Sequence, residues 1–206
     1  MNNGENLYPL LQLERLRMET DGPGVTTLVA GAGCPLKCVY CLNKRILKEK
    51  TPEWVTPDEL FRRTCIDDLY FQATGGGLCF GGGESLLHAR FISAFREKCG
   101  DAWKLTAETS LHVPAAQLKT AIGAVDHYLV DIKTLDPDIY RKYTGADLDP
   151  VLHNLKLLAG AVSPERVTVR IPLIPSYNDE ADRRRSEGLL AAMGFTTFDF
   201  FTYRIL

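Results

Sequence analysis

Apolar runs rich in β-branched and aromatic residues recur along the chain at intervals typical of alternating strands and helices. Six of these runs predict strands, at residues 25–31, 77–80, 104–106, 127–132, 167–174 and 197–203. Amphipathic stretches between them predict helices, at residues 56–68, 85–99, 114–122, 138–143, 149–159 and 179–193. Each predicted helix has a capping residue near its start or a glycine just after its end, as helices commonly do.

The alternation of strand and helix predicts parallel strands joined by right-handed crossovers. Such a chain closes toward a barrel or opens into a doubly wound sheet, and six units are too few for a closed barrel of eight. We therefore predict an α/β fold, a partial, open (β/α)6 TIM-like barrel. No repeat, low-complexity segment or linker divides the sequence, so residues 1–206 are predicted to form a single domain, with residues 1–20 a candidate N-terminal extension.

Residues that commonly take part in chemistry lie where the predicted strands end. The first strand is followed by a group of cysteines at residues 34–41. The other positions are residues 81–84 (GGGE) after the second strand, Glu108 and Thr109 at the third, Asp131 and Lys133 at the fourth, and Arg170 within the fifth. Because carboxyl ends of parallel strands meet at one face, we expect these groups to share a site there.

The balance of charges gives no basic field for nucleic acid, since 24 Lys and Arg against 26 Asp and Glu leave a net charge of −2. The longest apolar runs are far short of the roughly 20 residues that cross a bilayer, and the polar start MNNGENLYPL lacks the features of a secretory signal. We expect a cytoplasmic protein with no membrane or nucleic-acid partner. In that reducing compartment, clustered cysteines indicate metal binding or redox chemistry rather than disulfides.

Three of the six cysteines, Cys34, Cys38 and Cys41, fall within eight positions. A tight loop with this spacing can turn three thiolates toward one centre. A structural zinc site needs a fourth ligand, and no C-x-x-C or H-x-x-x-H partner occurs elsewhere, although a distant residue such as Cys79 stays open. A 4Fe–4S cluster held by three thiolates keeps one iron free for another ligand, and such a cluster can be redox-active at low potential. On these residues alone, a zinc site and an iron–sulfur cluster both stay open.

Residues 34–41 (CPLKCVYC) resemble the C-x3-C-x-aromatic-C signature of the radical S-adenosylmethionine (radical SAM) superfamily, in which the aromatic position, here Tyr40, lies near adenine. Residues 21–24 (DGPG) and 40–43 (YCLN) resemble segments of the glycyl radical enzyme activating enzymes, the pyruvate formate-lyase activase-like family. This resemblance runs from residue 20 or so to the C-terminus. It implies one 4Fe–4S cluster per chain and S-adenosylmethionine (SAM) as cofactors.

The resemblance also implies roles for the polar strand ends. Cys34, Cys38 and Cys41 are implied as cluster ligands, and Lys133 as a further catalytic residue that faces substrate or cofactor. The implied cofactor-binding residues are Tyr40, Asn43, Gly82, Gly83, Glu84, Glu108, Thr109, Asp131 and Arg170. Glycines let the methionine amine approach the backbone, hard oxygen ligands suit a monovalent cation beside the methionine carboxylate, and an arginine fork suits that carboxylate.

The sequence departs from the family pattern in two places. Between the cysteine cluster and residues 82–84 the chain holds only Cys65 and Cys79, so the ferredoxin-like insert with further cysteine clusters is absent and the form is minimal. Where relatives end strand six in P-Y-H, this chain reads FTYRIL. Tyr203 and Arg204 are the candidate replacements for that histidine.

The implied function is reductive cleavage of SAM at the cluster, followed by removal of a hydrogen atom from a glycine Cα of a partner glycyl radical enzyme, under anaerobic conditions. A flavodoxin or ferredoxin is the implied electron donor. Two alternatives stay open, a radical SAM enzyme that acts on a peptide or small molecule and a zinc-binding module without enzymatic activity. The run Arg183, Arg184 and Arg185 is either a solvated helix face or a docking patch for an acidic electron donor.

Overall fold

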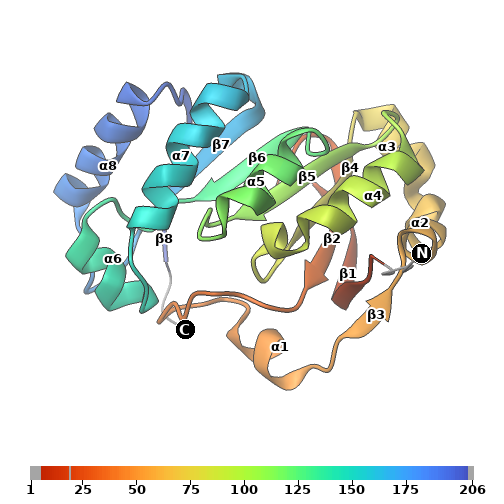
Figure 1. Ribbon diagram of the computed structural model, residues 1–206, viewed down its shortest axis with the longest axis horizontal. Helices are drawn as coiled ribbons and strands as arrows, with labels where there is room; N and C mark the ends of the chain where they lie inside the picture. Colours follow the sequence, from red (N-terminus) through yellow and green to blue (C-terminus); the bar gives the residue numbers. More distant parts are fainter. Residues whose placement is uncertain (1–5, 19, 204–206) are drawn as a thin grey trace.

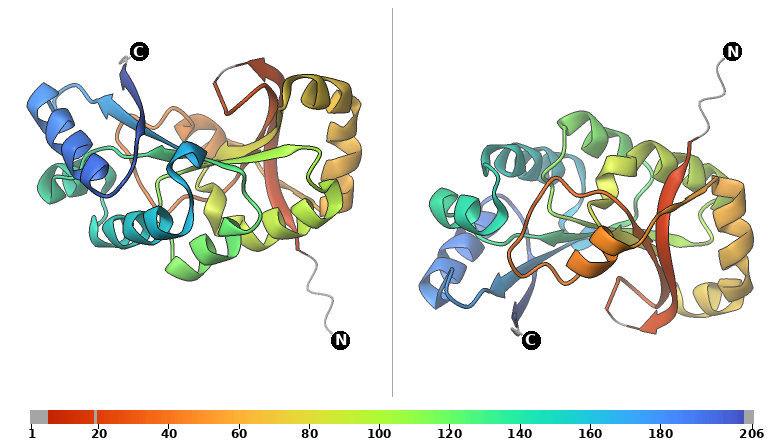
Figure 2. Two further views of the ribbon diagram at one scale, coloured as in Figure 1. Left: turned by 90° about the horizontal axis from the view of Figure 1, so that it is seen from above. Right: turned by 90° about the horizontal axis from the view of Figure 1, so that it is seen from below.

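The computed structural model describes residues 6–18 and 20–203 and shows a curved sheet with helices along its outer side (Figures 1 and 2). Within those residues the sheet has eight strands in the order β3-β1-β2-β4-β5-β6-β7-β8. Six neighbouring strands are parallel: β2 (Val25–Gly31), β4 (Gly77–Gly82), β5 (Lys104–Thr109), β6 (His127–Asp131), β7 (Val167–Leu173) and β8 (Thr197–Thr202). These are the six predicted strands, and the predicted α/β fold with an open, partial barrel is confirmed.

Two antiparallel strands extend the sheet beyond β2, and the sequence pattern did not predict them. β1 (Tyr8–Met18) pairs with β2, and the short β3 (Glu53–Val55) pairs with the first residues of β1. β1 begins buried and ends largely exposed, so it has neither the steady alternation of a half-buried strand nor the uniform apolar run of a fully buried one. Its register with β2 shifts twice, and Leu16 has a positive φ of 58°. Most of the candidate N-terminal extension is therefore a strand of the sheet.

The helices are α1 (Lys44–Glu49), α2 (Pro57–Thr64), α3 (Asp68–Thr74), α4 (Ala89–Cys99), α5 (Ala115–Ile122), α6 (Pro137–Thr144), α7 (Asp149–Ala161) and α8 (Glu180–Ala192). Thr56, Asp136 and Asp179 accept hydrogen bonds from first-turn N–H groups of α2, α6 and α8, as N-cap side chains do. In the part of the chain that the structure describes, no helix is long and apolar enough to cross a membrane.

The helix predicted at residues 56–68 is interrupted by a 3-10 turn, η1 (Cys65–Asp67). Asp67 is fully buried there and accepts hydrogen bonds from Arg15 at 2.5 and 2.8 Å and from Thr27 Oγ1 at 3.1 Å. These bonds hold the carboxylate against β1 and β2, so the chain turns at this point before α3 begins. The helix predicted at residues 85–99 also opens with a 3-10 turn, η2 (Ser85–His88), and a third, η3 (Pro164–Arg166), precedes β7.

The apolar core lies between the outer face of the sheet and the helices. Leu78 and Phe80 of β4 and Leu105 of β5 are fully buried in it. The ring of Phe80 meets that of Phe95 on α4 edge to face, with centroids 5.9 Å apart, a favourable geometry for aromatic pairs. With the apolar side chains on this face, the inner face of the sheet is left to polar groups.

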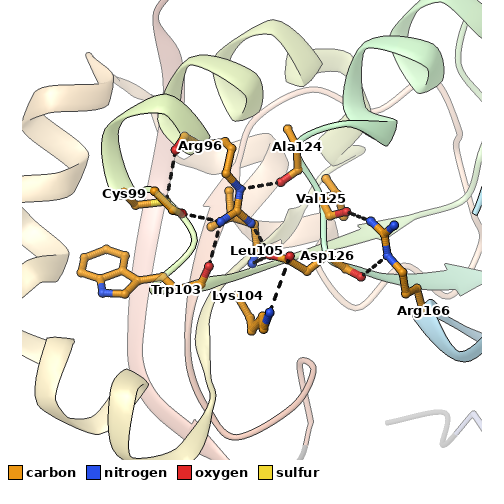
Figure 3. A network of polar contacts seen from close by, with 10 residues as sticks. Arg96, Cys99, Trp103, Lys104, Leu105, Ala124, Val125, Asp126 and Arg166 are labelled. Carbon is orange, nitrogen blue, oxygen red and sulfur yellow. Dashed lines mark hydrogen bonds and ion pairs between the residues drawn. The ribbon is translucent and has the colours of Figure 1, made fainter.

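A polar network joins the segments at the amino ends of β5, β6 and β7 (Figure 3). Arg96 of α4 donates to the Asp126 carboxylate and to three backbone carbonyls, those of Gly100 (2.5 Å), Trp103 (2.9 Å) and Ala124 (2.9 Å). Arg166 donates to two more carbonyls, those of Val125 (2.5 Å) and Asp126 (2.9 Å). Because most of the acceptors are main-chain atoms, the network fixes the path of the chain into these strands.

Candidate functional site

A cavity of about 570 Å³ lies on the inner side of the sheet, at the carboxyl ends of the parallel strands. It contains twelve of the thirteen site residues predicted from sequence: Cys34, Cys38, Cys41, Asn43, Gly82, Gly83, Glu84, Glu108, Thr109, Asp131, Lys133 and Arg170. Residues at or after the ends of β2, β4, β5 and β6 thus meet Arg170 of β7 in one place. Their individual roles remain predictions.

The loop that carries the cysteines is anchored on two sides. Toward β4, Gly83 N donates to Gly31 O at 3.0 Å, and Asn43 Nδ2 donates to Gly82 O at 2.7 Å. Toward α6, the backbone N–H groups of residues 37 and 39 donate to the carbonyls of residues 144 and 143, at 2.9 and 3.1 Å. The loop is therefore held by the glycine turn after β4 and by the end of α6, although it contains little regular structure itself.

Cys34, Cys38 and Cys41 are free thiols on the wall of this cavity. Burial raises the pKa of Cys34 to about 11 and also raises the pKa of Cys38, an effect that the Lys133 ammonium partly opposes. Any metal that binds must displace these thiol protons. Within residues 6–18 and 20–203, no three or more Cys, His, Asp or Glu side chains are gathered closely enough to hold a metal ion. A 4Fe–4S cluster is larger than a single ion and needs its thiolates farther apart, so the donor type, the three thiols and the adjacent cavity fit that group.

Gly82, the last residue of β4, and the following Gly83 line the cavity. Gly82 has a positive φ of 86°, a conformation that favours glycine. A Cβ at Gly83 would overlap Gly33 O, so this position has no room for a side chain. The two glycines allow the cysteine loop to lie directly against the end of β4.

The carboxylate of Glu84 is buried and fully engaged within the protein. It accepts hydrogen bonds from Thr109 Oγ1 at 2.6 Å, from Ser110 N and Oγ at 2.8 and 2.6 Å, and from Leu86 N at 3.2 Å. Burial raises its pKa despite these donors. The contacts show Glu84 and Thr109 tying the loop after β4 to the end of β5, rather than presenting free oxygens to the cavity.

A network of charged and polar side chains crosses the cavity from Glu108 of β5 to Tyr203, which directly follows β8. Arg170 donates from Nη1 to Glu108 Oε1 at 2.9 Å and from Nε to Asp131 Oδ1 at 2.7 Å. Lys133 Nζ lies 3.4 Å from Asp131 Oδ2 and donates to the Tyr203 hydroxyl at 3.1 Å. Arg170 therefore points into the cavity, whereas Val167 and Val169 on the other face of β7 are buried in the core. A monovalent cation at Glu108 and Asp131 would compete with Arg170 and stays a prediction.

The protonation states of the side chains in this network depend on the balance between burial and ion pairing. Burial raises the pKa of Glu108, and Arg170 offsets that only in part. Burial acts on Asp131 in the same direction, but Lys133 and Arg170 outweigh it and hold the pKa of Asp131 below its ordinary value. Lys133 loses hydration on burial, yet Asp131 raises its pKa. At neutral pH, Asp131, Lys133 and Arg170 are therefore charged.

Tyr40 is the one predicted site residue that does not line the cavity. Its ring meets that of Tyr177 edge to face, with centroids 5.8 Å apart, and lies 6.2 Å from that of Tyr143. The prediction that Tyr40 lies near adenine is therefore not tested by this geometry. The rings of Tyr40, Tyr143 and Tyr177 contact one another.

Other cavity residues were not predicted as part of the site. Glu14, Arg17 and Asp21 reach the cavity from β1 and the turn after it, and Arg17 donates to both carboxylates. Because the pattern of β1 does not predict a strand, only the DGPG turn indicates this region in the sequence. Tyr203 also lines the cavity, as one of two candidates for the missing histidine, whereas Arg204 lies outside the described residues.

The family model for the radical SAM superfamily matches residues 28–184. The chain is 32% identical over 128 residues to the indoleacetate decarboxylase activating enzyme of Tractidigestivibacter scatoligenes, covering 62% of this chain and 40% of that protein. It is 30% identical to the (2S)-3-sulfopropanediol dehydratase activating enzyme of Klebsiella oxytoca, covering 78% of this chain and 69% of that protein. It is 28% identical to the pyruvate formate-lyase 2-activating enzyme of Escherichia coli K12, covering 76% of this chain and 64% of that protein. The chain thus spans 40 to 69% of the length of these relatives.

Solved structures share the fold at low sequence identity. Streptococcus suis SuiB superposes with a TM-score of 0.65 at 14% identity, over 87% of this chain and 40% of that one. TYW1 with a lysine-pyruvate adduct superposes with a TM-score of 0.60 at 15% identity, over 88% of this chain and 65% of that one. At this identity the likeness concerns the arrangement of strands and helices.

Proposed function

Because this chain belongs to the radical SAM superfamily, we propose that it binds a 4Fe–4S cluster through Cys34, Cys38 and Cys41 and is an activating enzyme of a glycyl radical enzyme. The observation that carries the proposal is the single cavity in which these thiols face the charged chain from Glu108 to Lys133. When bound, the cluster supplies one electron to SAM, whose C5′–S bond breaks to give a 5′-deoxyadenosyl radical.

The residues of this chain bind and orient the cofactor. Gly82 and Gly83 line the cavity, and their backbone is the proposed contact of the methionine amine. Arg170 and Lys133 present positive charge to the same cavity, which suits the methionine carboxylate. The internal bonds of Glu84 keep the glycine turn in place while the cofactor enters.

The proposed substrate is a glycine Cα in a partner glycyl radical enzyme, from which the radical takes a hydrogen atom. Support comes from relatives with 28 to 32% identity, each of which is named as the activating enzyme of another enzyme. The open barrel adds support, since it leaves a side through which a polypeptide loop could reach the cavity. A flavodoxin or ferredoxin is the proposed electron donor, and the cytoplasm under anaerobic conditions is the proposed setting.

A radical SAM enzyme for a peptide or small molecule is the second candidate. It is favoured by one observation, the hydroxyl of Tyr203 beside Lys133 where the activating enzymes are expected to place a histidine. A changed group next to Lys133 alters the site that a substrate approaches.

The two candidates are separated by one anaerobic experiment. The protein is reconstituted with iron and sulfide, reduced with dithionite and mixed with SAM and a glycyl radical enzyme encoded beside it. We expect 5′-deoxyadenosine and the electron paramagnetic resonance doublet of a glycyl radical on the partner. Formation of 5′-deoxyadenosine without that doublet, on any glycyl radical enzyme of the same genome, would favour the second candidate. The Cys38→Ala variant is the control and should give neither product.

A further inference from the structure

The segment that carries the cysteine cluster and α1 is strongly basic in an acidic protein. Residues 37–50 contain five basic residues and one acidic residue, a net charge of +4, whereas the whole chain has a net charge of −2. Figure 1 shows α1 at the lower edge of the molecule, apart from the helices on the outer side of the sheet, and Figure 2 (right) shows it in front of the sheet. No residue of α1 is buried. The segment therefore presents its charge outward.

These charges are largely uncompensated. Arg45 lies 3.7 Å from Glu49, and both side chains are mostly exposed. The other basic residues of the segment form no ion pair with any acidic residue of the described chain: Lys37, Lys44, Lys48 and Lys50. A surface of this kind attracts an acidic partner, because opposite potentials steer association.

The arginine run on α8, the other candidate docking patch, is different. Arg183 pairs with Glu180 at 2.8 Å and lies over the ring of Phe200, and Arg185 pairs with Asp182. The charges of Arg183 and Arg185 are therefore compensated by acidic residues of the same helix. The basic surface around α1 has the larger free charge.

Exposed apolar side chains lie in the middle of the basic segment. Val39 is 41% exposed and Leu42 is 77% exposed, and they flank Tyr40 and Cys41. Leu42 and Cys41 also line the cavity, so the same short loop meets solvent on one side and the cluster ligands on the other. Apolar groups inside a charged rim are the usual arrangement of a protein–protein interface.

We propose that this cysteine-loop face is the docking surface of an acidic electron-carrier protein; it consists of Lys37, Val39, Leu42, Lys44, Arg45, Lys48 and Lys50. The inference rests on the proposed function, because the cluster must receive one electron for each SAM cleaved. In the step, the reduced carrier loses one electron and the oxidised cluster gains it. Docking here brings the carrier next to Cys41, so the electron need not cross the barrel.

The test compares two electron sources in one triple variant, Arg45→Glu/Lys48→Glu/Lys50→Glu. These side chains are exposed and lie outside the cavity, and glutamate retains helix propensity. SAM cleavage is measured with dithionite and, separately, with a reduced flavodoxin and a reduced 2Fe–2S ferredoxin as carrier probes, at equal iron content. We expect an unchanged rate with dithionite and a rate at least about tenfold lower with one or both carriers. The wild-type carrier-driven rate should fall as salt rises from about 50 to 300 mM, because salt screens exposed charges.

A matched control reverses the same number of charges elsewhere, in Lys119→Glu/Lys156→Glu/Arg184→Glu, at exposed positions on α5, α7 and α8. This variant should keep the carrier-driven rate within about twofold. Equal carrier-driven rates in wild type and the α1 variant, with normal dithionite-driven cleavage, would overturn the docking surface and leave the proposed function intact. Absence of dithionite-driven cleavage in wild type would overturn both. Binding of a short single-stranded RNA that only the α1 variant loses, with carrier-driven rates unchanged, would assign the surface to nucleic acid instead.

Discussion

An arginine and an aspartate meet at both ends of β6 and β7, but in different ways. At the amino ends, Asp126 precedes β6 and Arg166 precedes β7, and Arg166 donates to backbone carbonyls. At the carboxyl ends, Asp131 ends β6 and Arg170 lies in β7, and the bond joins the two side chains at 2.7 Å. The first pairing holds loops in place, whereas the second presents charge to a cavity.

This difference indicates which hydrogen bonds could be replaced by hydrogen bonds to a ligand. A guanidinium that bonds to carbonyls cannot leave without exposing main-chain acceptors, and an unpaired buried acceptor costs roughly 1–3 kcal/mol. Side chains that bond to one another around a cavity can instead exchange partners with an incoming ligand of matching charge. The amino-end network is therefore expected to govern stability and the carboxyl-end network to govern binding.

The largest expected difference is between a cysteine in the cavity at the carboxyl ends of the strands and a cysteine beside the amino-end network. Cys38→Ala should reduce the iron content of the reconstituted protein from about four atoms per chain to nearly none, because two thiolates cannot hold the cluster. Cys99→Ala, at the end of α4 beside the amino-end network, should retain the iron. Iron and sulfide analysis of anaerobically reconstituted protein measures both. Equal iron loss in the two variants would contradict the assignment of the ligands.

The arginines should separate stability from binding. Arg96→Met removes the guanidinium from the Asp126 carboxylate, which keeps only the donor Leu105 N at 2.8 Å, and takes a donor from three carbonyls. The free energy of unfolding should therefore fall by about 3 kcal/mol. Arg170→Met should instead raise the SAM concentration for half-maximal cleavage about 30-fold, with a smaller loss of stability because Asp131 keeps Lys133. Urea unfolding and a cleavage assay measure the two effects. The reverse pattern would refute the contrast.

The pKa of Glu108 gives a pH-dependent effect. Because burial raises that pKa in the folded state, the folded protein favours protonated Glu108. The resulting stabilisation is fully present below the pKa of Glu108 in the unfolded chain. It is lost as the pH rises through the pKa of Glu108 in the folded protein. Glu108→Gln should therefore increase the melting temperature at pH 8 by no more than about 4 °C and have little effect near pH 4. The same variant should weaken SAM cleavage.

Glu165 near the amino ends is the matched control for that variant. Hydrogen bonding to Ser163 lowers the pKa of Glu165, so its charged form is favoured in the folded state above the unfolded pKa. Glu165→Gln should give no increase in melting temperature at pH 8. An increase in both variants would show that the pH effect does not come from burial of Glu108.

Tyrosine hydroxyls should give the smallest effects. Tyr203→Phe removes the acceptor that Lys133 Nζ meets at 3.1 Å and should raise the SAM concentration for half-maximal cleavage about threefold to tenfold, a typical cost for one hydrogen bond. Tyr128→Phe removes a buried hydroxyl that has no hydrogen-bond partner in the described chain, so it should leave cleavage unchanged and stability equal or slightly higher. Titration of SAM in the cleavage assay distinguishes the two variants.

Much of the fold could be predicted from sequence because the parallel strands are coded locally. Their apolar runs lie within single segments, and β2 has the predicted bounds, residues 25–31. β1 could not be predicted in this way, since its irregular burial depends on pairing with β2 and on two register shifts. The interruption of the helix at Asp67 had no local signal either, because its cause is Arg15, 52 residues away.

The candidate site was predictable in so far as it follows from strand ends. Residue types such as Asp131 and Arg170 stand out in a sequence, and parallel topology brings them together. Which atoms they engage could not be predicted. The pattern gave no reason to expect that Glu84 would be saturated by Thr109 and Ser110, and the amino-end network is invisible in a sequence because its acceptors are carbonyls that every residue has.

The hydrogen bond from Asn43 to Gly82 O has a thermodynamic consequence. It joins the segment that would hold iron to the turn that would hold the sulfonium ligand. If ordering one of these segments favours order in the other, each ligand increases the affinity of the protein for its companion by the same factor, as reciprocity of coupled equilibria requires. Removing this bond with Asn43→Ala should then weaken the coupling between the two affinities.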